Sequence, residues 1–158
     1  MYPDSSEGLN KETEDSIYFF TVSFEPLNNW SAHVIHIWGK DFYTSEHAFQ
    51  WKKFSIVSPE CANKILLAKS PYSVFKISFA NKDKQPSDWS QKKIIVMEEI
   101  LRAKLEQHED VKNALKRTNG RRIIENSPVD NFWGIGPNKD GKSMLGNIWM
   151  KIRDGKQK

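Results

Sequence analysis

The stretch TSEHAFQWKKF, residues 44–54, has the pattern of a helix with one chemically unusual face. A threonine or serine at its start can cap the N-terminus, and the helix is expected to run to about Ser55. At 3.6 residues per turn, Glu46, Gln50 and Lys53 share one face, which aromatic residues flank. This face is either a solvated polar ladder or a polar set that the aromatic rings enclose in a cleft.

The enclosed alternative has chemical consequences. A carboxylate and a lysine in a water-poor cleft have coupled and shifted pKa values, which suit acid–base or Schiff-base chemistry. Glu46 lies in the first helical turn, where the helix dipole favours its anionic form. Glu46 is therefore expected to act as a base or to stabilise positive charge, rather than to donate a proton.

The segments around this helix predict an α+β fold in which helices dominate. Strands are expected at residues 16–22 and 34–38, and a strand or extended segment at 77–79. Apolar residues at three- or four-residue steps predict a long helix at residues 88–108. Further helices are expected at residues 59–69, 109–118 and 143–153.

The length of 158 residues predicts one domain, at residues 16–153. Residues 1–15 are polar and are expected to form a flexible tail, and residues 154–158 are expected to fray. The chain has no apolar run of about 20 residues and no export signal, so a cytoplasmic protein without membrane contact is expected.

The content of cysteine, histidine and charged residues narrows the possible kinds of site and ligand further. The single cysteine, Cys61, excludes an internal disulfide and is expected to be a small buried apolar residue. The four histidines and the single cysteine show no paired ligand spacing, so no zinc site is expected. No other metal and no cofactor is expected either. The net charge of +4 is compatible with a phosphate-bearing or nucleic-acid ligand but does not require one.

A glycine-rich loop, DNFWGIGPNKDGKSMLG at residues 130–146, is the second candidate for a site. Its glycines allow close approach of a ligand, and Lys142 precedes a predicted helix whose N-terminal amides could hold a phosphate. The segment GPNKDGKS matches the P-loop pattern, but we reject a nucleoside triphosphatase because no parallel strand is expected before it. Trp133 is either a stacking platform for a base or a core residue.

Three further side chains could serve a site or the fold alone. Glu125 and Asp130 bracket the turn at Ser127-Pro128, where carboxylates are usually only solvated. Trp89, in the long predicted helix, is either a core anchor or a ligand contact.

Four motifs, in this order and spacing, resemble the NADAR superfamily and its YbiA-like N-glycosidases. They are LNNW, TSEHAFQWKKF, DWSQKKIIVMEEILRAKLEQH and DNFWGIGPNKDGKSMLGNIWMKIR, at residues 27–30, 44–54, 88–108 and 130–153. The resemblance implies a mostly helical α+β single domain with a small sheet. It also implies hydrolysis of a ribose C1–N bond, either in phosphoribosylamino-pyrimidines, the early riboflavin intermediates, or in ADP-ribosylated guanine of nucleic acid.

The resemblance also implies roles for individual residues. By their match to family positions, Glu46 is the catalytic carboxylate and Lys53 is the general acid–base or Schiff-base residue. Asp130 is then a second catalytic carboxylate. Substrate contacts are implied for Asn28, Asn29, Gln50, Trp89, Glu125, Trp133, Gly134 and Lys142.

Two departures from the family pattern affect the expected substrate contacts and substrate preference. Ser143 replaces a family asparagine, and the loop at residues 28–30 reads N-N-W where the family has S-N-F.

Two other functions remain as alternatives to an N-glycosidase. One is a non-catalytic module that binds ADP-ribose or a nucleotide, and the other is a basic protein that binds plain RNA with a steep salt dependence.

Overall fold

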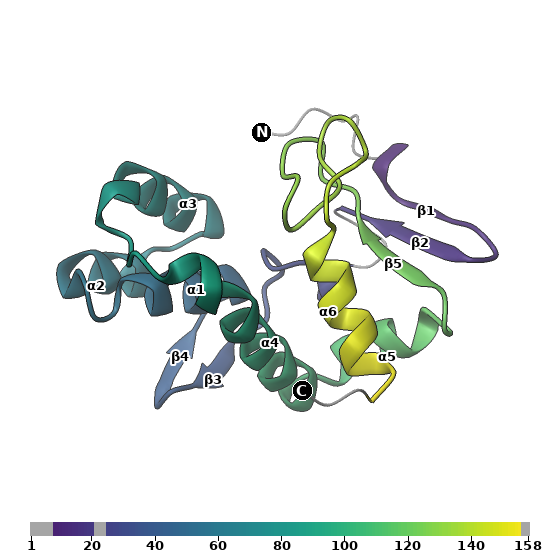
Figure 1. The fold of residues 1–158 in the computed structure, drawn as a ribbon. Helices are drawn as coiled ribbons and strands as arrows, with labels where there is room; N and C mark the ends of the chain where they lie inside the picture. The colour runs from purple at the N-terminus through teal and green to yellow at the C-terminus, as the bar shows by residue number, and fades with distance from the viewer. Residues whose placement is uncertain (1–7, 21–24, 156–158) are drawn as a thin grey trace. The chain divides into compact units, whose positions relative to one another are not determined.

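The computed structural model describes residues 8–20 and 25–155, which divide into two compact units (Figure 1). The central unit comprises residues 29–108, and the terminal unit comprises residues 1–28 and 109–158. Six α-helices and two small sheets lie within the described residues. The fold class is therefore α+β with helices dominant, as the sequence predicted.

The central unit begins with a hairpin of β3 (Ile35–Ile37) and β4 (Lys40–Phe42), which pair antiparallel. Trp38 and Gly39, between the strands, both have positive φ angles, of 53° and 72°. Two consecutive residues in this region form the turn that matches the twist of a tight hairpin. The strand predicted at residues 34–38 is confirmed, whereas β4 was missed because its sequence, KDF, is mostly polar.

Four helices complete the central unit: α1 (Ser45–Phe54), α2 (Pro59–Leu67), α3 (Pro71–Ala80) and α4 (Trp89–Gln107), with a short 3-10 turn, η3 (Lys82–Lys84), before α4. Thr44 caps α1, because its hydroxyl accepts a hydrogen bond from His47 N. A core cluster of Phe54, Cys61, Ala62, Ile65, Ala68 and Val74 joins the first three helices. Cys61 is thus buried as predicted, and burial raises the pKa of its thiol.

The strand or extended segment predicted at residues 77–79 is wrong, because these residues lie in α3. Ser70 caps this helix by accepting a hydrogen bond from Ser73 N, and Pro71 occupies its first turn. Proline favours that position because its missing N–H would have no helical partner there. The cap and the proline outweigh the β-branched and aromatic character of Ile77 and Phe79.

The terminal unit contains a three-stranded sheet of β1 (Lys11–Glu12), β2 (Ser16–Phe19) and β5 (Arg122–Glu125). β2 pairs with β1 antiparallel and with β5 parallel. The predicted strand at residues 16–22 is found at its beginning, while residues 21 and 22 lie outside the described residues. β1 falls within the segment expected to be a tail, and β5 was not predicted.

Three helical elements accompany this sheet: η2 (Glu25–Leu27), α5 (Glu109–Arg117) and α6 (Met144–Arg153). The helix α6 packs closely on β5, since a Cβ atom on Gly146 would lie 1.9 Å from the carbonyl oxygen of Ile123. Trp149 of α6 is fully buried and donates from its ring nitrogen to the carbonyl of Leu27 at 2.9 Å. These contacts fix the end of the glycine-rich loop that leads into α6.

None of the helices in the described residues is both long enough and apolar enough to cross a membrane.

Candidate functional site

A chain of hydrogen bonds runs from α1 to α3 in the central unit. The Gln50 side-chain amide donates to the Glu46 carboxylate at 2.9 Å, and the Ser78 hydroxyl donates to the Gln50 carbonyl oxygen at 2.7 Å. Gln50 and Ser78 are buried, while Glu46 is half-buried. The predicted polar face is therefore enclosed at its Gln50 end and is not a fully solvated ladder.

Lys53 lies on the same face, in partly apolar surroundings. Its ammonium nitrogen is 5.8 Å from the ring centroids of Phe49, Phe54 and Trp89. Burial lowers the pKa of Lys53, and the positive charge of Lys93 lowers this pKa further, while the Glu46 carboxylate opposes both effects. The lowered pKa increases the share of neutral amine relative to that of a solvated lysine, and the neutral amine is the form that acts as a nucleophile or a base.

Trp89, at the start of α4, forms part of the apolar surroundings of Lys53. Its side chain is only 6% exposed, and its ring centroid lies 5.1 Å from that of Phe49. Trp89 is therefore a buried residue that packs on α1, and its ring also lies beside Lys53 in the candidate site.

The loop before β3 contains Asn28 and Asn29, which were expected to contact the substrate, and their hydrogen bonds differ. The carbonyl of Asn29 accepts a hydrogen bond from Glu46 N at 3.1 Å, so this residue holds the first turn of α1. The side-chain oxygen of Asn29 is buried and makes no hydrogen bond within the described residues. Asn28, in contrast, donates from its side-chain amide to the carbonyl of Phe20 in the terminal unit to which both belong.

His47 is a site neighbour that the sequence analysis did not single out. Its Nε2–H donates to the carbonyl of Ala68 at 3.0 Å, which leaves Nδ1 to accept from the Thr44 hydroxyl at 2.7 Å. Burial lowers its pKa, although the bond to Ala68 acts against this shift. His47 therefore ties the start of α1 to the end of α2, and the Thr44–His47 spacing was the available sequence signal.

The remaining predicted site residues lie in the terminal unit, at the end of β5 and in the loop that follows. Asp130 accepts backbone hydrogen bonds from Phe132 N at 2.9 Å and Trp133 N at 2.8 Å through one carboxylate oxygen. This oxygen shapes the loop in the same way that a side chain caps a turn. Asp130 thus has a structural function beside any role in catalysis.

Gly134 and Glu125 lie directly against each other. A Cβ atom at residue 134 would lie 2.7 Å from Glu125 Oε2 and 2.7 Å from the Cβ of Ser127. Any larger residue would displace the carboxylate, so glycine is required here for steric reasons. Trp133 is half-buried, and its ring meets that of Phe132 edge to face at 4.8 Å.

The predicted backbone cradle for phosphate at the start of α6 is wrong. The amides of residues 142–145 already donate to the carbonyls of residues 131–134 of the loop, at 2.9–3.2 Å. They are therefore not available to an anion, and the exposed side chain of Lys142 is what remains of the predicted cradle. The expectation that no parallel strand precedes the loop was wrong, because β5 pairs parallel with β2 directly before it. A P-loop is instead rejected because these hydrogen bonds occupy the amides that would bind a phosphate.

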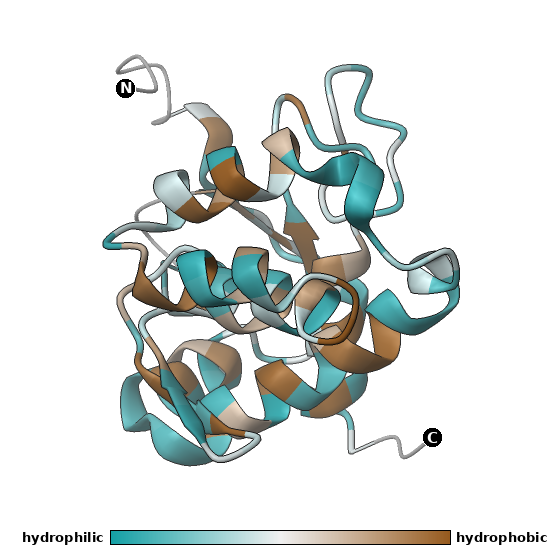
Figure 2. Ribbon diagram, turned by 90° about the vertical axis from the view of Figure 1, so that its left-hand side faces the viewer, coloured by the Kyte–Doolittle hydropathy of each residue, from teal (hydrophilic) through white to brown (hydrophobic). Residues whose placement is uncertain are grey.

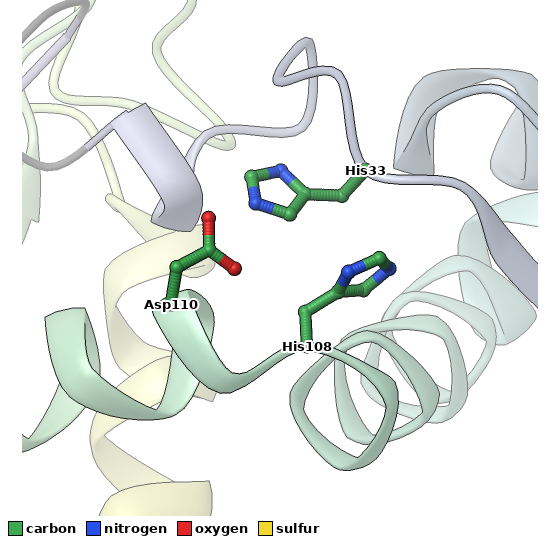
Figure 3. Close-up of side chains that lie close together, drawn as sticks. All are labelled: His33, His108 and Asp110. Carbon is green, nitrogen blue, oxygen red and sulfur yellow. The ribbon is translucent and has the colours of Figure 1, made fainter.

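Two histidines of the central unit also meet, as Figure 3 shows for His33 and His108. Their ring centroids are 4.9 Å apart and nearly perpendicular. Ser31 lies 2.7 Å from His33 Nδ1 and accepts a hydrogen bond from the fully buried Lys104 at 2.8 Å. Figure 3 also labels Asp110, which belongs to the terminal unit. Within the central unit this cluster therefore offers two imidazoles, which are fewer than the three or four protein ligands of a zinc site.

The central unit also has a pocket of about 300 Å³ that is separate from the candidate site residues. Its lining consists of Val34, Leu66 and residues 40–43, without Glu46, Gln50 or Lys53. The candidate site therefore rests on charge, burial and hydrogen bonding, and not on the size of a cavity. The structure brings Glu46, Gln50, Lys53 and Trp89 together in one unit, and Glu125, Asp130, Trp133, Gly134 and Lys142 belong to the other.

Comparison with known proteins identifies the family. Residues 10–155 match the NADAR domain. An N-glycosidase of Nostoc punctiforme is 33% identical over 144 residues, which cover 88% of this chain and 91% of that protein. N-glycosidase YbiA of Shigella boydii is 30% identical over 155 residues, or 96% of each chain. The solution structure of Escherichia coli YbiA matches with a TM-score of 0.77 at 28% identity, over 93% of this chain and 88% of that one. This chain belongs to the NADAR family.

Proposed function

We propose that this protein is an N-glycosidase that hydrolyses the bond between ribose C1 and an exocyclic amine. The observation that carries the proposal is Lys53, whose pKa burial lowers while the Glu46 carboxylate lies close enough to oppose that shift. A lysine nucleophile or base acts as the neutral amine, and burial shifts the pKa of Lys53 in the direction that increases the share of this form. The relatives named as N-glycosidases agree with this chemistry.

Direct hydrolysis is one route through these residues. The C1–N bond breaks, a proton moves to the departing nitrogen, and the oxygen of water adds to C1. Positive charge develops at C1 in the transition state, and the Glu46 carboxylate stabilises it. Protonated Lys53 donates the proton to the amine in this route, and Glu46 accepts one from water.

A covalent route uses Lys53 as the nucleophile. In the ring-opened sugar, C1 forms an imine with the exocyclic nitrogen. The neutral Lys53 amine adds to C1, the substrate amine leaves with a proton, and an imine between Lys53 and the sugar remains. Water then adds to C1 and releases the sugar aldehyde and the free lysine. The lowered pKa of Lys53 is compatible with both routes, because it makes the ammonium a stronger proton donor and also increases the share of neutral amine.

The proposed substrates are a phosphoribosylamino-pyrimidine or an ADP-ribosylated guanine, which share the C1–N bond to an exocyclic amine. A riboflavin biosynthesis protein of Vibrio vulnificus is 31% identical over 89% of this chain, which spans 38% of that protein. We further propose Asp130 as a second carboxylate, and substrate contacts for Asn28, Asn29, Gln50, Trp89, Glu125, Trp133, Gly134 and Lys142.

The test of turnover supplies each substrate separately to the purified full chain. Mass spectrometry then detects released ribose 5-phosphate or ADP-ribose, and we expect release from one of the two substrates. Binding of both compounds without release from either would contradict the proposal and would instead identify a non-catalytic binding module.

The Glu46→Gln variant tests the carboxylate. The amide oxygen of the new side chain can still accept from the Gln50 amide, so the fold and substrate affinity should be retained. The negative charge is lost, and the turnover rate should fall by about a hundredfold or more. An unchanged rate at an unchanged melting temperature would contradict the role of Glu46.

Borohydride reduction tests the covalent route, with the neighbouring lysine as a matched control. A sugar adduct on Lys53 should be trapped in the wild type and in Lys52→Met, but not in Lys53→Met. The ammonium of Lys52 lies 4.6 Å from the Trp38 ring centroid, and Lys52 is not on the helix face that Glu46, Gln50 and Lys53 share. Rapid turnover without any trapped adduct would rule out the covalent route and leave direct hydrolysis.

A further inference from the structure

The pocket beside the β3–β4 hairpin has the size and the lining of a small-molecule site. Its volume of about 300 Å³ is at the lower end of the range for such sites. Val34, Tyr43 and Leu66 give it an apolar part. In Figure 2, which views the molecule from the side of α2 and α3, hydrophobic and hydrophilic residues are interleaved along the helices. This mixture suits a small ligand better than a wide apolar interface.

The main chain of β4 supplies hydrogen-bonding groups to this pocket. Ile37 and Lys40 flank the two-residue turn of the hairpin, so the next pair, His36 and Asp41, directs its N–H and C=O groups away from the partner strand. Within residues 8–20 and 25–155, the N–H and the carbonyl of Asp41 make no hydrogen bond. Because Asp41 lines the pocket, one donor and one acceptor lie side by side at its wall.

The other strand of the hairpin shows which group binds such a donor–acceptor pair. The side chain of Gln107, from α4, accepts a hydrogen bond from His36 N at 2.8 Å and donates to the His36 carbonyl at 2.8 Å. A single planar carboxamide thus satisfies both outward groups of one residue. Asp41 has the same register position on the opposite edge of this two-stranded sheet, so the amide of a ligand can bind it in the same way.

The charged side chains at the pocket have both signs. Of the lining residues, Lys40 and Asp41 are charged, and the Asp41 carboxylate lies 2.7 Å from His36 Nδ1. The ammonium of Lys69 is 5.9 Å from the centroid of the Tyr43 ring. Positive and negative groups therefore accompany the pocket together, which suits a neutral polar ligand better than an ion of either sign.

The length of β4 favours a single amide over an added strand. β4 has three residues, and of these only Asp41, in the middle, directs both main-chain groups outward. Strand addition obtains its affinity from a row of such groups, and very short edge strands discourage it. A second copy of this chain, paired on the same edge about a two-fold axis at Asp41, would bring two carboxylates directly opposite each other, which is unfavourable.

We infer that this pocket binds a small neutral molecule that carries a primary carboxamide or a lactam edge. The ligand donates an N–H to the Asp41 carbonyl and accepts from the Asp41 N–H, while its apolar body packs against Val34 and Leu66. Both kinds of amide present a donor and an acceptor side by side, as the Gln107 side chain does. The candidate catalytic residues do not line this pocket, so the inference does not depend on the proposed function.

The test titrates the isotope-labelled full chain with benzamide and, separately, with uracil, and follows its NMR signals. Benzamide carries the primary carboxamide and uracil the lactam edge, so the two titrations distinguish the two kinds of amide. At least one probe should shift the Asp41 amide and the Leu66 methyl signals to saturation, with a dissociation constant on the order of 1 mM. The N-methylated forms, N,N-dimethylbenzamide and dimethyluracil, cannot donate a hydrogen bond and should bind about tenfold more weakly.

Two substitutions at one position separate the main chain from the side chain. Asp41→Pro removes the outward N–H, and proline is tolerated on an edge strand where its nitrogen faces away from the ladder. Asp41→Ala retains this N–H and loses the same contact with His36. The probe should bind Asp41→Pro about tenfold more weakly than Asp41→Ala, as the Leu66 methyl shifts would report. The comparison of each probe with its N-methylated form uses the wild type, so it decides the matter even where Asp41→Pro does not fold.

Several results would overturn the inference. They are no saturable shift with either probe up to about 10 mM, equal affinity for the N-methylated forms, and equal affinity of the two Asp41 variants. Binding of a blocked peptide of alternating threonine and valine, without binding of either amide, would identify strand addition to β4 instead. Shifts of residues 40–43 on raising the protein concentration alone, again without binding of either amide, would identify self-association through this edge.

Discussion

At the scale of single residues, the surroundings of Lys53 lower the pKa of its amine and oppose the stability of the fold. An ammonium group near three aromatic rings loses part of its hydration, and the nearby Glu46 carboxylate compensates only in part. The same loss of hydration that lowers the pKa of Lys53 therefore makes its charged form costly in the folded state. Replacing it by an apolar side chain of similar shape should remove this cost.

Lys53→Met should raise the free energy of unfolding at neutral pH by about 0.5–1 kcal/mol and abolish turnover. The folded-state pKa of Lys53 lies below 10.5, so the unfolded chain binds this proton more tightly. The penalty is complete below the folded pKa and declines as the pH rises toward 10.5. The stability difference from the wild type should therefore shrink in alkaline solution, as urea denaturation at several pH values would measure.

The control for this prediction is Lys52→Met. Lys52 lies over the Trp38 ring at 4.6 Å, so its replacement should lower the free energy of unfolding slightly or leave it unchanged. Equal stabilisation by both substitutions would show that removal of positive charge in general, and not burial of Lys53, is responsible.

At the scale of elements, helix caps and close packing decide which segments form and how they meet. The helices α2 and α3 both begin with serine followed by proline, yet only Ser70 makes a side-chain cap bond. In the terminal unit, Gly146 lets α6 approach the β5 backbone without a side chain between them. The Ser70 cap and the close approach at Gly146 can each be tested by comparing the free energy of unfolding of two similar variants.

Ser70→Ala should lower the free energy of unfolding by about 1 kcal/mol, because the hydroxyl accepts a hydrogen bond from Ser73 N at 3.1 Å. Ser58→Ala changes the same residue type at the same position of α2, where no side-chain cap bond exists. It should change stability by less than about 0.5 kcal/mol. Equal losses in chemical denaturation of the two variants would contradict the importance of the cap in α3.

Gly146→Ala should lower the free energy of unfolding by about 1–3 kcal/mol. The new Cβ would lie 1.9 Å from the Ile123 carbonyl oxygen, so α6 and β5 must separate. Thermal denaturation followed by circular dichroism would measure this loss. Asn147→Ala, at the next and exposed position of α6, should change stability by less than about 0.5 kcal/mol, and a similar loss there would argue against the steric explanation.

At the scale of the whole molecule, stability depends on pH through buried titratable groups such as His47. His47 is 1% exposed and uses both ring nitrogens in hydrogen bonds that require its neutral form at Nδ1. Its pKa is lowered in the folded protein, so the unfolded chain binds more protons below pH 6.5.

The free energy of unfolding should therefore fall as the pH decreases from 6.5 toward the folded pKa of His47. The slope attributable to this one group is at most about 1.4 kcal/mol per pH unit. Urea denaturation at pH values between about 5 and 7 would measure it. His47→Gln should be less stable overall but less sensitive to pH, and an unchanged pH dependence in this variant would contradict the role of His47.

The amino-acid sequence by itself determined the helices α1, α2, α4, α5 and α6 and the helical α+β class, because caps and apolar spacing act within one element. It also determined the shared face of Glu46, Gln50 and Lys53, since that face follows from helical geometry alone. The family resemblance, carried by four motifs, implies chemical roles that helical geometry could not assign.

Only the tertiary structure decided which of these polar groups are enclosed. Ser78 reaches Gln50 across 28 positions of the chain, and the loop carbonyls of residues 131–134 occupy the amides that had been expected to hold a phosphate. The strand β5 likewise exists because it pairs with β2, more than 100 residues earlier. Burial, pKa shifts and hydrogen-bond partners of this kind arise from contacts between distant segments, and for that reason local sequence patterns could not predict them.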